Sequence, residues 1–166
     1  MLTAHEIFGF MSPALAVEIV DHLHTSEKEV YRAALQAVAE AKKVRPLFLE
    51  RKAKSDRHRE MAEALAKPRL DFVALNALQT WLLKKQTALL VDFLDTLGIP
   101  HKNGVVDDLP TTVPEDKLKA TVDQLLARHP REHVAVYLRA FNDLNEAGWP
   151  VLGEMLDRDE RLQLGA

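Results

Sequence analysis

The stretch from Leu70 to Leu97 contains neither glycine nor proline, and a series of its large apolar residues recurs at helical intervals. The series consists of Leu75, Leu78, Leu82, Leu89, Phe93 and Leu97. Such spacing gathers side chains on one face of an α-helix, whereas a half-buried strand requires strict alternation. At 1.5 Å per residue, an unbroken helix here would measure roughly 42 Å. We therefore predict one long central helix, with a break near Lys84-Lys85 as the alternative.

Helical spacing continues through the rest of the chain, and strand alternation is almost absent. Ser12 followed by Pro13 is typical of a helix N-cap and a favoured first helical residue. Pro46 and Pro68 are expected to interrupt helices, because a residue that precedes proline disfavours the α conformation. The sequence predicts an all-α fold: a single compact irregular bundle of about seven helices, in which residues 1–166 form one domain.

Residues 99–112 form the one long connection that is expected to be irregular. Within it, Asn103-Gly104 is typical of a tight primed turn, so residues 100–106 are predicted to form a miniature hairpin. His101 lies across this turn from Asp107 and Asp108, where the three side chains could gather a cation or act as acid and base. A solvated loop is the alternative, since two adjacent aspartates repel each other.

The composition excludes several chemistries. The chain has no cysteine, which excludes thiol catalysis, thiolate zinc sites and disulfides. Its six glycines are isolated, whereas phosphate-binding loops need several close together, and each of its three serines is placed to cap a helix. No cofactor and no catalytic residue are predicted. The N-terminal residues lack the basic region of a secretory signal and no apolar stretch would span a bilayer, so we expect a cytoplasmic protein that binds no membrane.

Charge is distributed unevenly along the sequence. The whole chain carries a net charge of −3, but residues 42–87 carry +7, between −4 on residues 1–41 and −6 on residues 88–166. Some basic side chains in the central stretch have an acidic neighbour four residues away, as in Glu50 and Lys54. Six others, all within residues 42–57, lie outside the pairs Glu50–Lys54, Arg59–Glu63 and Glu63–Lys67: Lys42, Lys43, Arg45, Arg51, Lys52 and Arg57. We predict that these six form one binding patch if the chain folds back at Pro46. The alternative is a solvated helix face that binds no partner.

The expected partner of this patch is an acidic protein surface, either on another protein or on the acidic C-terminal half of a second copy. Nucleic acid is an alternative partner, because clustered lysine and arginine also bind phosphates. It is not favoured, since the isoelectric point is near 6.2 and single-stranded nucleic acid calls for exposed aromatic side chains. The one aromatic residue of the stretch, Phe48, is expected to be buried between two leucines.

Seven histidines raise the alternative of a metal-dependent helical-bundle enzyme. Di-metal bundles use inward-facing glutamates and two Glu-x-x-His turns. The nearest pattern lies at the end of one helix, and no second motif matches it. Glu18, Asp21, His22 and His24 are therefore weak candidates for metal ligands. The competing interpretation is that the two histidines stabilise the C-terminus of their helix.

The segments LVDFLDTLGIPHKNGVVDDLP, VDQLLARHP, VAVYLRAFN and GWPVL resemble a group of small bacterial all-helical proteins of unknown function. The similarity extends over most of the chain from Val44 onward. It implies a bacterial source and a shared helical fold, but no activity, cofactor or site residue. The sequence therefore leads us to expect a protein–protein interaction module or a small homo-oligomer rather than an enzyme.

Overall fold

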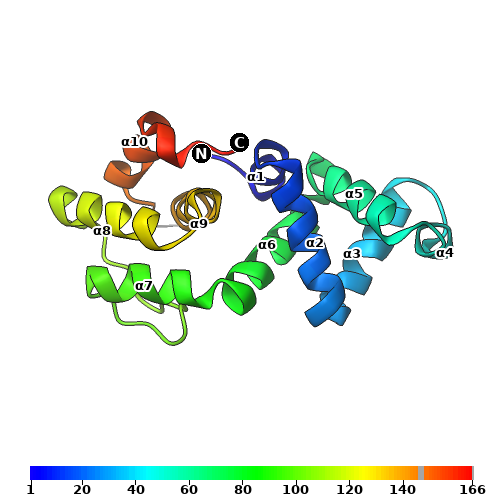
Figure 1. The fold of residues 1–166 in the computed structure, drawn as a ribbon, viewed down its shortest axis with the longest axis horizontal. Helices are drawn as coiled ribbons and strands as arrows, with labels where there is room; N and C mark the ends of the chain where they lie inside the picture. The colour runs from blue at the N-terminus through cyan, green and yellow to red at the C-terminus, as the bar shows by residue number, and fades with distance from the viewer. Residues whose placement is uncertain (146–147, 166) are drawn as a thin grey trace. The chain divides into compact units, whose positions relative to one another are not determined.

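The computed structural model describes residues 1–145 and 148–165 and is all-helical over these residues (Figure 1). Its ten α-helices there are α1 (Ala4–Phe10), α2 (Pro13–Ser26), α3 (Lys28–Ala41), α4 (Pro46–Glu50), α5 (Lys54–Leu65), α6 (Asp71–Lys85), α7 (Thr87–Leu97), α8 (Glu115–Arg128), α9 (Arg131–Asp143) and α10 (Pro150–Arg158). Two short 3-10 helices, η1 (Pro68–Leu70) and η2 (Glu160–Leu162), complete the described elements. The prediction of an all-α fold is confirmed, with more and shorter helices than the seven expected.

Residue contacts divide the chain into two compact units. The α1–α5 unit comprises Thr3–Trp81 together with Gly165, and the α7–α10 unit comprises Leu82–Leu164 together with Met1–Leu2. Helix α6 contributes its residues up to Trp81 to the first unit and the remainder to the second. Folding of the whole chain as a single domain stays a prediction.

Helix α2 is the packing centre of the α1–α5 unit and contacts both α3 and α5 (Figure 1). It begins as the sequence predicts: the Ser12 hydroxyl accepts a hydrogen bond from the Leu15 N–H at 3.2 Å, and Pro13 is the first helical residue. Ile19 and Leu23, which share one face of the helix, are fully buried. Burial of each such side chain contributes about 1.5–3 kcal/mol, so this face holds the three helices together.

The single long helix predicted between residues 70 and 97 is not confirmed. The backbone leaves the helical conformation at Gln86, with φ −106° and ψ 27°, and this separates α6 from α7. The Thr87 hydroxyl donates to the carbonyl of Leu83 at 2.6 Å, a local hydrogen bond that competes with regular helix continuation. The break therefore lies beside Lys84-Lys85, where the sequence offered it as the alternative.

Helices α7 and α8 run side by side in the α7–α10 unit and are joined through Asp92 (Figure 1). Its carboxylate accepts hydrogen bonds from Gln124, Arg128 and His129, the last at 2.9 Å from Nε2. Burial alone would raise the pKa of Asp92, but the hydrogen bonds from His129 and Gln124 and the charge of Arg128 lower it overall. One carboxylate thus ties the middle of α7 to the C-terminal end of α8.

An aromatic cluster forms the core between α7, α9 and the start of α10. Phe93 lies edge-on to Tyr137 and Phe141, with ring centroids 5.5 and 5.2 Å apart. Trp149 packs against Phe141 at 5.0 Å and donates its indole N–H to the carbonyl of Pro110 at 2.7 Å. Because an indole can be buried favourably only when its N–H finds an acceptor, this bond anchors the 99–112 connection to the core.

The miniature hairpin predicted at residues 100–106 is confirmed as an isolated antiparallel bridge. Lys102 and Val105 exchange two backbone hydrogen bonds of 2.9 and 3.0 Å. Asn103 and Gly104 between them both have positive φ, 52° and 90°, which is the requirement of a primed turn. A Cβ atom at Gly104 would lie 3.0 Å from the Cβ of Leu90, so the turn also needs the absence of a side chain.

We expect Gly104→Ala to lower the free energy of unfolding by about 1–3 kcal/mol, because it forces an L-residue into left-handed backbone against Leu90. Urea denaturation followed by circular dichroism measures the change. Gly9→Ala is the matched control: Gly9 is helical and its added Cβ would lie 3.6 Å from Ala66, so this variant should be neutral or slightly more stable. Equal stability of the two variants would contradict the steric account of the turn.

Candidate interaction surface around helix α4

The six basic residues predicted to form one patch divide into two groups of three. Lys42 and Lys52 both pair with Glu60, at 3.1 and 2.5 Å. Glu60 therefore joins the end of α3 to the α4–α5 connection, and the hydrogen bond from Lys52 is the largest cause that lowers its carboxyl pKa. Both ammonium groups are therefore paired within the protein, with a carboxylate that lies farther away in the sequence than one helical turn.

Arg57 also holds the fold together. Its Nε donates to the Tyr31 hydroxyl at 2.8 Å, and its Nη1 donates to the carbonyls of Glu50 and Lys52, both at 3.2 Å. These bonds tie α5 to α3 and to the C-terminal end of α4. Of the six residues of the predicted patch, three are exposed without such bonds in the described part of the chain: Lys43, Arg45 and Arg51.

Phe48 is exposed, so its predicted burial is wrong. The reason is the length of α4, which has only five residues and turns just one side chain, Leu49, into the core. The neighbouring Leu47 and Phe48 are 51% and 55% exposed. The Lys52 ammonium lies 5.0 Å from the centroid of the Phe48 ring, within the range of a cation–π contact.

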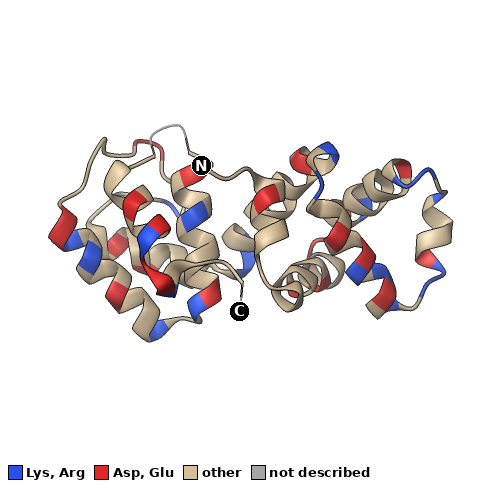
Figure 2. Ribbon diagram, turned by 90° about the horizontal axis from the view of Figure 1, so that it is seen from above, with Lys and Arg blue, Asp and Glu red and all other residues tan. Residues whose placement is uncertain are grey.

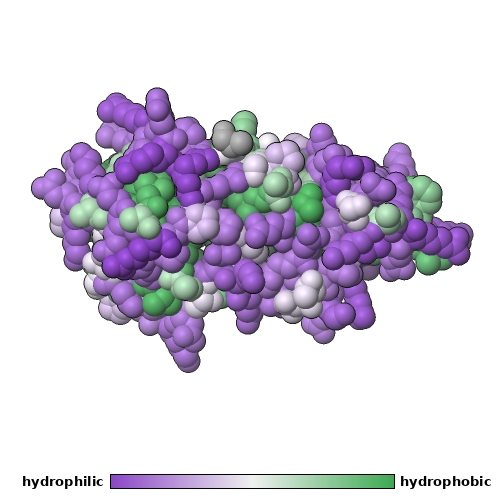
Figure 3. Space-filling view, in the orientation of Figure 1, coloured by the Kyte–Doolittle hydropathy of each residue, from purple (hydrophilic) through white to green (hydrophobic). Residues whose placement is uncertain are grey.

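These side chains line one open groove of about 770 Å³, which we call the α4 surface: Val44, Arg45, Leu47, Phe48, Arg51 and Lys52. Figure 2 shows basic residues on both sides of the short α4 helix. Figure 3 shows hydrophobic residues among hydrophilic ones on the part of the α1–α5 unit that carries α4. Single exposed leucines are common on protein surfaces, whereas a contiguous exposed apolar group is typical of a binding surface. Here the apolar group is flanked by arginines that have no acidic partner among the described residues.

Of the four weak metal-ligand candidates, Asp21 belongs to a hydrogen-bonded chain with His58 and Tyr31, and His24 packs against that chain. Asp21 Oδ1 lies 2.5 Å from His58 Nδ1, and His58 Nε2 lies 3.0 Å from the Tyr31 hydroxyl. The His24 ring packs edge-on against both aromatic partners, with centroids 4.8 Å from Tyr31 and 5.0 Å from His58. Glu18 is exposed and His22 is partly buried on the same helix. Within residues 1–145 and 148–165, no group of three potential ligands is placed to hold a metal ion.

Burial determines the protonation of this chain. It lowers the pKa of His58, which is completely buried, and outweighs the hydrogen bond and charge of Asp21, which raise that pKa. It also lowers the pKa of His24, with further lowering by His58 and Arg57. Burial raises the pKa of Tyr31 in spite of the nearby Arg57. All three rings are therefore uncharged at neutral pH.

Sequence reasoning missed His58 and Tyr31, although a signal for His58 was present. His58 lies on the same helical face as Met61, Ala62 and Leu65, which are all buried in α5. A histidine on such a face must find buried hydrogen-bond partners. The partners themselves are 37 and 27 residues away in the chain, beyond the reach of local spacing.

His101 also has a different partner from those expected. Its Nε2 lies 2.6 Å from the carboxylate of Asp95, at the end of α7, and its Nδ1 accepts a hydrogen bond from the Gly104 N–H at 3.1 Å. The structure thus assigns His101 to supporting the hairpin rather than to a site with Asp107 and Asp108.

No described helix combines the length and apolar character needed to cross a bilayer. Comparisons with protein-family models, with curated proteins and with solved structures give no match to this chain. The resemblance to small bacterial helical proteins therefore stays a prediction, and the functional interpretation depends on the geometry of the α4 surface.

Proposed function

We propose that the protein is a cytoplasmic protein-binding module whose α4 surface docks an acidic segment of another protein that also carries apolar side chains. The observation that supports this most directly is the exposure of Leu47 and Phe48 between Arg45 and Arg51. Burial of leucine and phenylalanine side chains on binding contributes about 1.5–3 kcal/mol each. The two arginines add attraction for carboxylates and fix the orientation of the partner.

Charge complementarity favours an acidic partner over a neutral one. The stretch 42–87 carries a net charge of +7, while the protein as a whole is negative. An acidic segment is therefore attracted to this region and repelled by most of the rest of the chain, which gives both a steering effect and selectivity. Nucleic acid fits less well, because Lys42, Lys52 and Arg57 are already bonded within the protein.

The test uses a fluorescently labelled acidic amphipathic peptide that contains leucine and phenylalanine, with binding measured by fluorescence anisotropy. We expect the pair Leu47→Ser and Phe48→Ser, made together, to weaken binding at least tenfold, because about 1.4 kcal/mol corresponds to a factor of ten. The pair Arg45→Glu and Arg51→Glu should weaken it similarly, more so at low salt. The control is Phe72→Ser, since Phe72 is 81% exposed in the same unit but lies outside the groove.

Two results would overturn the proposal. Tight binding of a single-stranded oligonucleotide that persists in the Leu47→Ser and Phe48→Ser variant, with a steep dependence on salt, would identify a nucleic-acid surface. A concentration-dependent mass in sedimentation experiments that is lost in the arginine variant, without peptide binding, would identify a second copy as the partner. Peptide binding that is lost with both pairs and kept with Phe72→Ser supports the proposed function.

A further inference from the structure

A second concave site lies in the α1–α5 unit, at the junction of the C-terminal end of α2 and the first turns of α3. This pocket of about 250 Å³, the α3 pocket, is lined by His24, Lys28, Tyr31, Arg32, Leu35, Glu50 and Arg57. Since a water molecule takes about 30 Å³ of liquid volume, the pocket has room for a small ion with a few waters. It is smaller than the usual cleft for a drug-sized ligand, which starts at about 300 Å³.

Arg57 is held rigidly in this pocket. Its Nε and Nη1 make three hydrogen bonds, to the Tyr31 hydroxyl and to the carbonyls of Glu50 and Lys52. No bond to its Nη2 occurs within residues 1–145 and 148–165, so one edge of the guanidinium keeps its donors available. A guanidinium that is fixed before the ligand arrives loses little entropy on binding, which makes arginine an effective partner for carboxylate and phosphate.

The hydrogen-bonded chain of Asp21, His58 and Tyr31 supports this arrangement. Because His58 is neutral, its Nδ1–H donates a hydrogen bond to the carboxylate of Asp21, and its Nε2 accepts one from the Tyr31 hydroxyl. The oxygen of Tyr31 in turn accepts the Nε–H of Arg57 at 2.8 Å. Three helices thus contribute to the position of one guanidinium, which makes Tyr31 and His58 positioning residues for the pocket.

The charges around the pocket favour an anion. Lys28 and Arg32 are exposed at its rim, and in the described part of the chain no carboxylate pairs with either of them. Glu50 is the one acidic side chain in the lining, so the charged groups that face the pocket sum to a net +2 with Arg57. His24 is uncharged at neutral pH and offers a polar ring edge.

From these observations we infer that the α3 pocket binds a small oxyanion, a carboxylate or phosphate group, between the free edge of Arg57 and the side chains of Lys28 and Arg32. This site is separate from the α4 surface, because neither Lys28 nor Arg32 lines that groove. The carboxylate of Glu50 repels a bound anion and therefore lowers the affinity of the pocket. A dissociation constant on the order of 1 mM is expected for a free ion held at one such site.

The test is a titration of the whole protein with sodium phosphate and, separately, with sodium succinate, at constant ionic strength, followed by amide chemical shifts in NMR spectra. Saturable shifts that centre on residues of the α3 pocket are expected for at least one ion, and the ion that saturates identifies the group that is recognised. Arg32→Gln and Lys28→Gln should each weaken binding about fivefold, the effect of one unit charge at 4 Å in water. Glu50→Gln should strengthen it by a similar factor.

Two controls keep this site distinct from the α4 surface. Arg45→Gln removes a cation from the α4 surface and should leave oxyanion binding unchanged, and Arg32→Gln should leave binding of the acidic peptide unchanged. Shifts that grow linearly without saturation for both ions would overturn the inference. So would equal binding by the wild type, Arg32→Gln and Lys28→Gln.

Discussion

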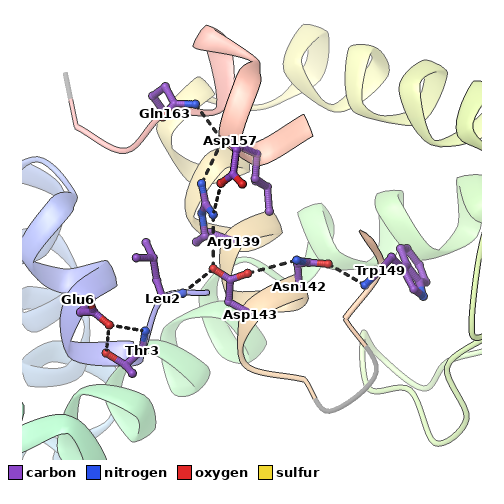
Figure 4. Close-up of polar contacts among 10 residues, drawn as sticks. Leu2, Thr3, Glu6, Arg139, Asn142, Asp143, Trp149, Asp157 and Gln163 are labelled. Atoms are coloured by element: carbon purple, nitrogen blue, oxygen red, sulfur yellow. Dashed lines mark hydrogen bonds and ion pairs between the residues drawn. The ribbon is translucent and has the colours of Figure 1, made fainter. Parts of the chain in front are cut away.

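Arg139→Met is expected to lower the free energy of unfolding by about 3–5 kcal/mol, the cost of removing one partner from a buried ion pair. Arg139 lies in α9 of the α7–α10 unit, with its side chain almost completely buried (Figure 4). Its Nη1 lies 3.5 Å from Asp143 and 3.4 Å from Asp157, and its Nη2 donates to the carbonyl of Leu156 at 3.0 Å. The arginine therefore joins α9 to α10.

The size of the effect comes from Asp143, whose side chain is only 2% exposed. Its oxygens also accept hydrogen bonds from the Leu2 N–H at 2.9 Å and from the Asn142 amide at 3.2 Å, and neither of these donors carries a charge (Figure 4). Without Arg139, the carboxylate must stay charged in a buried environment or take up a proton. Either change stabilises the unfolded chain relative to the folded one.

Urea denaturation at neutral pH measures this loss. Adding Asp143→Asn to Arg139→Met should restore part of the stability, because the amide removes the uncompensated charge. Arg161→Met is the control: Arg161 pairs with Asp123 and Asp159 but is 51% exposed, so its loss should cost no more than about 1 kcal/mol. A loss below 1 kcal/mol for Arg139→Met would show that the pair contributes no more than a surface ion pair.

Stability of the wild-type protein is expected to fall as the pH is lowered from about 7 toward about 5, mainly because of His58. Its pKa is lowered in the folded protein, so below the unfolded value of about 6.5 the unfolded chain binds a proton that the folded protein does not. Stability is then lost progressively as the pH falls toward the folded pKa. His24, whose pKa is also lowered, acts in the same direction.

Urea midpoints measured across this range test the effect. His58→Ala should cost about 3–5 kcal/mol at pH 7, because it creates a cavity and leaves the buried Tyr31 hydroxyl without its acceptor. The same variant should lose less stability on acidification than the wild type. His24→Gln should reduce the slope with a smaller loss at pH 7, since His24 is partly exposed. Stability that rises on acidification would contradict this account. The lowered carboxyl pKa values of Asp71, Asp92 and Asp159 remove stability mainly below about pH 5, so they add little across this range.

Features governed by local backbone preferences could be predicted from the sequence. The N-cap at Ser12 and the turn at Asn103-Gly104 each depend on a few adjacent residues, whose conformational preferences are strong. The helix break at Gln86 was less certain, because the residues around it allow helix and tertiary packing decides. The all-α fold class could be predicted from the spacing of apolar residues. The number of helices could not, because it depends on break points such as Gln86.

The candidate site was less predictable, because its character depends on contacts between distant residues. The basic stretch and its position were apparent in the sequence. The ion pairs of Glu60 with Lys42 and Lys52 were not, because they depend on how α3 and α5 pack together. Phe48 was expected to be buried because both its neighbours are leucines. A helix of one turn cannot bury three successive side chains, and the length of α4 was not evident from the pattern.

The contribution of Met1–Leu2 to the α7–α10 unit has a consequence for dividing the protein into fragments. A fragment that begins at Leu82 lacks the Leu2 N–H, and with it one of the donors that solvate the carboxylate of Asp143. Such a fragment would place a less satisfied buried charge in its own core before any partner was removed. Removing Met1 and Leu2, a truncation often made for recombinant expression, therefore removes a hydrogen bond to a residue of α9 that lies 141 positions downstream.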